Sequence, residues 1–298
     1  MPRPIVTTGV PIDCINAVSA DSAPFGTELS PAALRAAGLP AAVGAADGGD
    51  LDVRLVGRDR DPATGVLGWP SVLATTEAIR TLVRDQVTAG ELPFLLGGCC
   101  TLLPGALSGA RDALGQIGLG YLDGHLDLYD GQTSETGEPA DMPVSVITGH
   151  GPAAWSAAIG APLVTRPGLV LLGPRDRGEA VAFGSVLPED AGLDTELTPA
   201  ILRDRGLAAA GRQARDQLSA AAGRYWVHLD VDVLDELAFP ATDYLQPGGL
   251  TLAELGEVLP PLLASPALAG VSVACYNPQK DADGSGAAAV LELFASLS

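Results

Sequence analysis

Two short stretches of alternating acidic residues are the segments of this sequence best suited to chemistry. They read Asp123-Gly-His125-Leu-Asp127 and Asp230-Val-Asp232. Residues two apart in an extended chain point to the same side, so the side chains of each stretch are expected to converge. Carboxylates gathered in this way repel one another and cannot all stay ionised without a counter-charge. Oxygen ligands mixed with an imidazole suit Mn²⁺ or Fe²⁺, and the two stretches therefore predict a site for divalent cations.

Two divalent ions held by shared carboxylates would supply hydrolytic chemistry. A water molecule bound between two metal ions becomes a hydroxide near neutral pH, and this hydroxide attacks an electrophilic carbon. The residues alone therefore predict a metal-dependent hydrolase that holds one or two divalent ions, either Mn²⁺ or Fe²⁺.

Six apolar runs precede loops rich in Gly, Pro or Asp and predict strands that are buried on both faces. The runs are Pro4–Gly9, Leu92–Leu96, Ile117–Leu122, Leu169–Leu172, Tyr225–Leu229 and Ala269–Ala274. Helical periodicity fills the gaps at Ala32–Ala37, Thr75–Ala89, Pro199–Ala222, Thr251–Leu263 and Gly286–Leu297. This alternation predicts an α/β fold with three αβα layers around a mainly parallel central sheet.

Both acidic stretches directly follow predicted strands. Ligands of open parallel sheets bind beyond the carboxyl ends of the strands, so the predicted fold places both stretches where a site is expected. We expect a single domain over residues 1–298. Within it, Asp47–Asp61 and Asp130–Gly151 are expected to be long irregular loops.

The composition argues against several classes of partner. Lys and Arg number 17 against 36 Asp and Glu, and the net charge of −19 at pH 7 disfavours nucleic acid and anionic membranes. No apolar stretch reaches the roughly 18 residues of a transmembrane helix. The first residues lack a basic segment followed by an apolar block, which is the pattern of a secretory signal. We therefore expect a cytoplasmic protein that acts on a small-molecule substrate.

The same residues resemble the motifs of the arginase/agmatinase (ureohydrolase) family. That family's D-x-H-x-D motif matches the first acidic stretch, and its D-V-D-x-x-D segment begins at Asp230. A G-x-R-D turn at Gly173–Asp176 and an N-P dipeptide at Asn277–Pro278 also match. The resemblance implies the family's fold, its manganese ions and a homo-oligomer, either a trimer or a hexamer.

The resemblance also implies roles for single residues. One metal ion would be held by Cys100, Asp123, Asp127 and Asp230, and the other by Asp123, His125, Asp230 and Asp232. Asp127 would also orient the attacking water and relay its proton.

Cys100 is a departure from the family pattern. It stands where the G-G-D-H-S motif of the family has a metal-binding His. Hydrolases of N-hydroxyarginine, which resemble this family, also have a Cys at this position. A thiolate is softer than an imidazole, so the Cys100 site would also accept Fe²⁺ or Zn²⁺.

Two further departures concern catalysis and the substrate. Ala140 stands where the family has its catalytic His, and no carboxylate lies between Ser272 and Asn277, where the family has the Glu that binds a guanidinium. A buried guanidinium without a carboxylate partner is unfavourable, so the substrate is expected to be less basic or held differently. His150 is the candidate replacement for the general acid. Candidate substrate contacts are Glu138, Asp243, Tyr244 and Cys275.

The leading prediction is a hydrolase of a non-peptide C–N bond in a guanidino, hydroxyguanidino or amidino small molecule. The alternative is a catalytically inactive arginase-fold protein that is kept for ligand binding or assembly. Metal content separates the two. A third hypothesis makes Cys100 a covalent nucleophile at a single-metal site, which would lose activity when a His replaces the Cys.

His228 lies two residues before Asp230, so both side chains point to the same side of the predicted strand. His228 is expected either in the core or behind the metal ligands.

Overall fold

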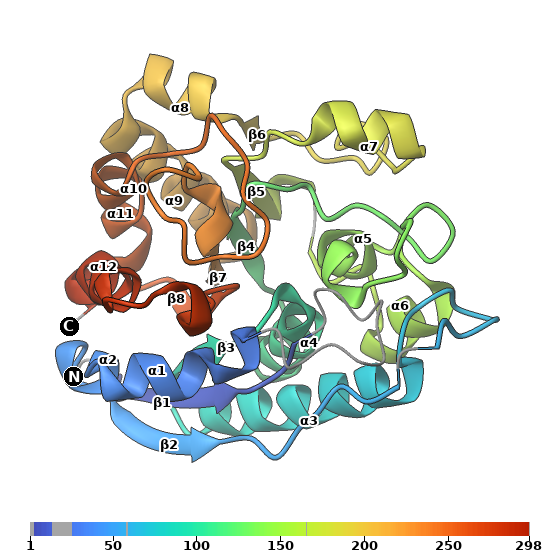
Figure 1. Cartoon of the computed structure of the whole chain (residues 1–298), viewed down its shortest axis with the longest axis horizontal. Helices are drawn as coiled ribbons and strands as arrows, with labels where there is room; N and C mark the ends of the chain where they lie inside the picture. The colour runs from blue at the N-terminus through green and yellow to red at the C-terminus, as the bar shows by residue number, and fades with distance from the viewer. Residues whose placement is uncertain (1–2, 14–25, 58, 165, 298) are drawn as a thin grey trace.

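The computed structural model describes residues 3–13, 26–57, 59–164 and 166–297. An eight-stranded sheet runs through these residues in the order β2-β1-β3-β8-β7-β4-β5-β6, and all neighbouring strands are parallel (Figure 1). The strands are β1 (Ile5–Val10), β2 (Ala46–Asp50), β3 (Leu92–Gly97), β4 (Gly118–Leu122), β5 (Leu169–Leu172), β6 (Glu196–Leu197), β7 (Tyr225–Asp230) and β8 (Leu268–Ala274). The predicted α/β class is confirmed.

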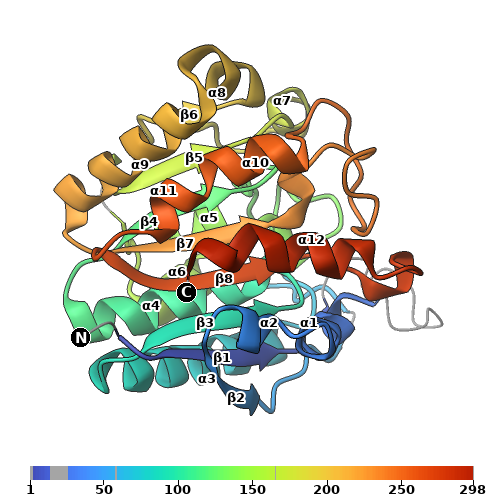
Figure 2. The ribbon, with the colours of Figure 1, turned by 90° about the vertical axis from the view of Figure 1, so that its left-hand side faces the viewer.

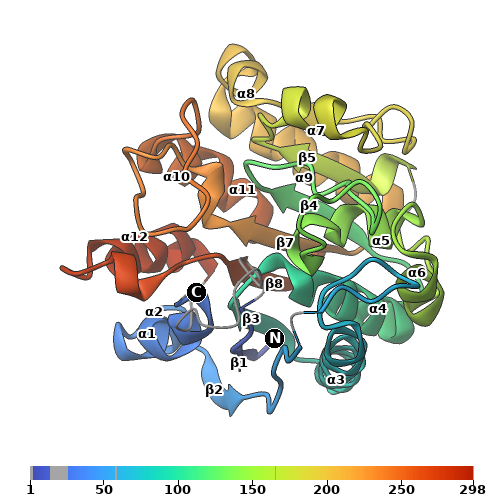
Figure 3. The ribbon, with the colours of Figure 1, turned by 45° about the vertical axis from the view of Figure 1, so that its right-hand side comes forward.

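Helices cover both faces of the sheet. One face carries α3 (Trp69–Thr88), α4 (Leu103–Leu114), α5 (Pro143–Thr148) and α6 (Ala153–Ile159). The other carries α1 (Ser30–Ala36), α2 (Leu39–Ala42), α8 (Pro199–Arg205), α9 (Leu207–Ala222), α10 (Leu252–Val258), α11 (Pro260–Leu263) and α12 (Ser285–Phe294), while α7 (Arg177–Phe183) follows β5 (Figures 2 and 3). In the part of the chain that the structure describes, no helix has the length and apolar character needed to cross a bilayer.

All six apolar runs overlap with strands, and the two strands that have no sequence signal lie at the edges of the sheet. β2 has the sequence Ala-Asp-Gly-Gly-Asp and is exposed along its length, and β6 has two residues. An edge strand with an exposed face needs no apolar run. The irregular loop predicted over Asp47–Asp61 is therefore wrong at its start, which belongs to β2. The loop predicted over Asp130–Gly151 is wrong at α5.

Two predicted helices are each divided in the structure. Pro199–Ala222 forms α8 and α9 because Gly206 between them has a φ of 79° and a ψ of 120°, which are not helical angles. Thr251–Leu263 forms α10 and α11, because Pro260 and Pro261 have no N–H with which to continue the hydrogen-bond ladder.

The four strands at the centre of the sheet position the site. Cys100 follows β3, Cys275 follows β8, Asp230 ends β7, and Asp123 follows β4. Because β3, β8, β7 and β4 are consecutive neighbours in the sheet, their carboxyl ends meet at one edge. Residues that are far apart in the sequence are thereby brought together.

Helix α4 starts directly after the turn that contains Cys100, and it packs closely on α3. A Cβ atom at Gly109 would lie 2.3 Å from the carbonyl oxygen of Arg80, and one at Gly105 would lie 2.6 Å from that of Thr76. The close approach of the two helices therefore requires glycine at both positions.

Replacement of Gly109 by alanine is expected to lower the free energy of unfolding by about 1–3 kcal/mol, because the new methyl group overlaps backbone atoms of α3. Gly256→Ala is the control. Gly256 is an exposed residue of α10, and no atom lies within 4 Å of a Cβ added there. This second change is expected to stabilise the protein by about 0.5–1 kcal/mol. Urea unfolding measures both values, and equal effects would contradict the close packing of α4 on α3.

Candidate metal centre

A cavity of about 280 Å³ lies at the carboxyl ends of the central strands. The side chains that line it include eight carboxylates, one imidazole and two thiols but, among the described residues, no Lys or Arg. These groups belong to Cys100, Asp123, His125, Asp127, Glu135, Asp141, Asp176, Glu179, Asp230, Asp232 and Cys275. This volume is just below the range of about 300–1,000 Å³ that is usual for small-molecule sites.

Carboxylate oxygens hold the loops after β4 and β7 in place. Asp123 Oδ1 accepts a hydrogen bond of 2.6 Å from the His125 N–H, and Asp230 Oδ1 accepts one of 2.8 Å from the Asp232 N–H. Asp232 Oδ1 accepts a third, of 3.0 Å, from the Gly124 N–H. The second oxygen of each carboxylate faces either the His125 ring or the Cys100 thiol.

The first group of candidate ligands consists of Asp123, His125 and Asp232, whose ligand atoms all lie within 4.8 Å of one another. His125 Nδ1 is 3.4 Å from Asp123 Oδ1 and 3.1 Å from Asp232 Oδ2. Burial opposes the charged form of His125, but the Asp232 and Asp123 carboxylates outweigh it and raise the pKa of the ring well above its usual value. A cation in this group would replace the proton of His125.

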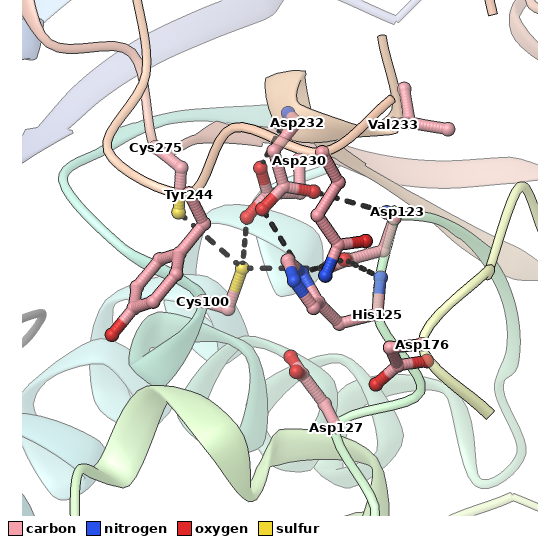
Figure 4. Close-up of polar contacts among 12 residues, drawn as sticks. Cys100, Asp123, His125, Asp127, Asp176, Asp230, Asp232, Val233, Tyr244 and Cys275 are labelled. Atoms are coloured by element: carbon pink, nitrogen blue, oxygen red, sulfur yellow. Dashed lines mark hydrogen bonds and ion pairs between the residues drawn. The ribbon is translucent and has the colours of Figure 1, made fainter. Parts of the chain in front are cut away.

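The second group consists of Cys100, Asp230 and Cys275, whose ligand atoms also lie within 4.8 Å of one another (Figure 4). Cys100 Sγ is 2.8 Å from Asp230 Oδ2 and 3.8 Å from Cys275 Sγ. Asp123 Oδ2 is 3.8 Å from the same sulfur, so Asp123 faces both groups. Two neighbouring cation positions that share a carboxylate fit this arrangement.

Apart from the protonated His125 ring, the described lining of the cavity offers its carboxylates no positive charge. Burial, with the nearby charge of Asp232, raises the pKa of Asp123 to about 6. Burial also raises the pKa of Asp230 well above its usual value, and Asp232 and Asp123 add to the effect. Oxygen, nitrogen and sulfur ligands that cannot all ionise without a cation fit bound divalent metal ions.

Asp127 lines the cavity but does not converge with Asp123 and His125 as the alternation predicts. Its φ of 50° shows that the chain has left the extended conformation, so residues two apart no longer point to the same side. Asp127 Oδ2 accepts a hydrogen bond from the Tyr121 hydroxyl, and the side chain lies apart from both groups of ligands (Figure 4). Burial, with the charge of Asp123, raises the pKa of Asp127 well above its usual value.

His228 is buried in β7 and fits both of its expected placements. Its ring stacks on Tyr121 with 5.2 Å between the ring centroids. Nδ1 is 2.7 Å from Ser272 Oγ, and Nε2 is 3.3 Å from Cys100 Sγ. Burial lowers the pKa of His228 to about 3, so the ring is neutral. His228 is therefore a core residue that also contacts a candidate metal ligand.

Three of the other predicted site residues lie outside the cavity lining. His150 is exposed, and its Nδ1 is 3.3 Å from the Thr148 hydroxyl, so it does not replace the missing general acid. Asp243 accepts hydrogen bonds from Asn277 and Lys280 instead of facing the cavity. Glu138 is buried and accepts a hydrogen bond of 3.0 Å from the Tyr244 hydroxyl.

Tyr244 and Cys275 both line the cavity, as the prediction for these two substrate contacts requires. The Tyr244 ring packs edge-on against His125 at 5.9 Å between the ring centroids. Through its hydroxyl, Tyr244 links Glu138 to the wall of the cavity. The role of both side chains in substrate binding stays a prediction.

Sequence reasoning did not find Asp141, Asp176 and Glu179, which form an acidic wall of the cavity. Asp176 ends the G-P-R-D segment after β5, and this position was a usable signal. Its Oδ2 accepts a hydrogen bond from the Leu126 N–H, whereas its Oδ1 is buried without a hydrogen-bond partner among the described residues. Asp141 and Glu179 come from a loop and a helix that the sequence does not place.

Residues 3–298 match the Arginase family, so the chain belongs to this family of hydrolases, and the sequence resemblance is confirmed. The arginase of Agrobacterium fabrum is 25% identical over 91% of this chain and 85% of its own length. The arginase of Brucella melitensis is 28% identical over 91% and 90%.

Solved structures show the same fold. The arginase of Bacillus caldovelox has a TM-score of 0.87 at 23% identity, with 99% of this chain and 98% of that chain covered. The proclavaminate amidino hydrolase of Streptomyces clavuligerus has a TM-score of 0.72 at 18% identity, with 99% and 90% covered. The predicted three-layer arginase-like fold is thus confirmed.

The acidic wall makes stability depend on pH in a defined direction. Burial raises the pKa of Asp141 to about 6, although the Ser134 hydroxyl donates a hydrogen bond to it. The native state therefore binds this proton more tightly than the unfolded chain, and its ionisation destabilises the fold as the pH rises from about 4 to about 6. We expect the free energy of unfolding of Asp141→Asn, relative to the unsubstituted protein, to rise by about 2 kcal/mol over this interval.

Asp130→Asn is the control for this measurement. Burial opposes ionisation at Asp130, but the N–H groups of Thr133 and Gln132 outweigh it and lower the pKa of this carboxylate. The stability that this carboxylate contributes is gained below about pH 4 and is almost complete above it, so Asp130→Asn is expected to change little relative to the unsubstituted protein between about pH 4 and about pH 6. Urea unfolding at several pH values checks both. Equal changes in the two variants over this interval would contradict the raised pKa of Asp141.

Proposed function

We propose that this chain is a metal-dependent hydrolase that cleaves a non-peptide C–N bond in a guanidino, hydroxyguanidino or amidino small molecule. The proposal is carried by the cavity with its eight carboxylates, its single imidazole and no Lys or Arg among the described lining residues. Such a cavity attracts divalent cations and a cationic substrate. Membership of the arginase family supports hydrolysis as the reaction.

Two metal ions per chain are proposed, in neighbouring positions. Asp123, His125 and Asp232 offer the oxygen and nitrogen ligands that suit Mn²⁺. Cys100 and Asp230 belong to the other position, and Asp123 faces both. When bound, divalent ions lower the pKa of a coordinated water molecule and polarise the carbon under attack.

Asp127 is the proposed proton-transfer residue. Its Oδ2 is occupied by the Tyr121 hydroxyl, so Oδ1 is the atom that holds or releases the proton. Burial, with the charge of Asp123, raises the pKa of Asp127 well above its usual value, which favours the form that carries a proton. Because His150 and Ala140 supply no acid at the cavity, Asp127 is the proposed donor to the leaving amine.

The acidic wall revises the expected substrate. The missing guanidinium-binding Glu favours a weakly basic substrate only if no other carboxylate is available. Asp141, Asp176 and Glu179 line the same cavity, and the unpartnered Asp176 Oδ1 offers an acceptor for an N–H group. We therefore propose a substrate with a cationic guanidino or amidino group rather than a neutral ureido group.

The alternative function is an inactive arginase-fold protein kept for ligand binding or assembly. The replacement of the family's metal-binding and catalytic histidines by Cys100 and Ala140 favours this alternative. The uncompensated buried carboxylates oppose it, since they destabilise a fold that binds no cation. The homo-oligomer, a trimer or a hexamer, is a proposal from the family resemblance alone.

Metal analysis and a product assay test the proposal together. Protein purified with Mn²⁺ and Zn²⁺ is expected to hold about two ions per chain and to release urea, hydroxyurea or ammonia from members of a guanidino and amidino panel. Asp232→Asn is expected to lower kcat/KM by roughly 100-fold or more, because it removes a ligand and a partner of His125. Asp216→Asn, on the exposed side of α9, is the matched control and should change kcat/KM by less than about twofold. Folded protein without bound metal and without activity would instead favour the inactive alternative.

A further inference from the structure

We propose that Cys100, Cys275 and Asp230 form a two-sulfur metal position that takes Zn²⁺ in preference to Mn²⁺. The proposal rests on the metal-dependent function proposed above and goes beyond it, because it makes Cys275 a ligand and assigns a different metal to each position. For Cys275, the role of metal ligand then replaces the role in substrate binding that the sequence predicts.

The spacing of the two sulfurs fits a zinc ion. Two Zn–S bonds of about 2.3 Å at a tetrahedral angle place their sulfurs about 3.8 Å apart. Cys100 Sγ and Cys275 Sγ are 3.8 Å apart in the structure. Asp230 Oδ2 lies 2.8 Å from Cys100 Sγ as a hydrogen-bond acceptor, and a bound ion would replace the thiol proton that this bond uses. A small rotation of the carboxylate then completes three ligands.

Cys275 has a strained backbone conformation, and this conformation directs its sulfur into the cavity. Its φ of 65° is in the left-handed region, and Asp127 is the one other non-glycine residue of the described chain with a positive φ. The Cys275 N–H donates a hydrogen bond of 2.7 Å to the carbonyl oxygen of Gly98, which ties the end of β8 to the turn before Cys100. Glycine or asparagine would adopt this conformation at lower cost. The cysteine instead directs its thiol into the cavity.

A chain of buried hydrogen bonds supplies an N–H to the sulfur of Cys100. Trp226 Nε1 is a donor only, and it donates to Ser272 Oγ at 2.9 Å. The hydroxyl of Ser272 can then donate to His228 Nδ1 at 2.7 Å, which leaves the single proton of the neutral ring on Nε2. His228 Nε2 is 3.3 Å from Cys100 Sγ. His228 is thus a positioning residue that stabilises a metal-bound thiolate without touching the metal or the substrate.

The two positions differ in the softness of their ligands. Thiolates favour Zn²⁺ over Mn²⁺, whereas carboxylate and imidazole ligands also suit Mn²⁺. Asp123, His125 and Asp232 provide no sulfur, so the site as a whole combines a zinc position with a manganese position.

Cobalt absorption tests the sulfur ligands without using activity. Metal-free full-length protein, kept under a phosphine reductant, is titrated with Co²⁺ while the sulfur-to-cobalt charge-transfer band is recorded. We expect the band intensity of the unsubstituted protein to fall to about half in Cys275→Ser and in Cys100→Ser, since each variant loses one of the two thiolates. Zn²⁺ is expected to remove the band, and an equal concentration of Mn²⁺ is not.

Control variants keep the outcomes separate. Asp232→Asn, in the group without sulfur, should keep the full band, and His228→Gln should weaken Co²⁺ affinity by roughly tenfold while keeping both thiolates. Cys275→Asn suits the left-handed backbone and replaces Cys275→Ser if the latter does not fold. A full band in either Cys275 variant, or bound cobalt without a charge-transfer band, would overturn this inference and leave the proposed hydrolase standing. Folded protein that binds no Co²⁺, Mn²⁺ or Zn²⁺ would overturn both.

Discussion

Mutual repulsion among buried carboxylates at one edge of the sheet is the constraint on which the site depends. Two unit charges 4 Å apart repel by about 4 kcal/mol at an effective dielectric constant of 20, and a whole domain has only about 5–15 kcal/mol of stability. In the metal-free chain, this repulsion and burial raise the pKa values of Asp123 and Asp230, so that binding a proton relieves the repulsion. Bound divalent cations would relieve the same repulsion, and they would also supply the reaction chemistry.

The order of the strands decides which residues share that edge. The sequence predicts that each acidic stretch follows a strand, because the apolar runs end directly before it. It does not predict that β3, β8, β7 and β4 are consecutive, since strand order depends on contacts between distant segments. Cys275 shows the consequence. Nothing in its local sequence marks it as a ligand, yet β8 lies between β3 and β7 and brings its thiol next to Cys100.

Spacing correctly predicts that four of the alternating residues share one cavity, and it fails at the fifth. Asp123, His125, Asp230 and Asp232 all line the cavity, but the chain leaves the extended conformation before Asp127, and that side chain diverges. His150 and Asp243 lie in segments whose direction depends on tertiary contacts, and neither lines the cavity. For the same reason, the sequence does not predict that Asp141 and Glu179 line the cavity. A carboxylate in a loop has no pattern that separates a cavity wall from a solvated surface.

We propose that the acidic edge of the sheet binds two divalent ions of different kinds. Anomalous X-ray scattering from crystals grown with one equivalent of Zn²⁺ per chain and an excess of Mn²⁺ tests this proposal most directly, because each element is located at its own absorption edge. We expect a zinc peak among Cys100, Cys275 and Asp230 and a manganese peak among Asp123, His125 and Asp232. A well-ordered cavity with no anomalous peak at either edge would contradict the account.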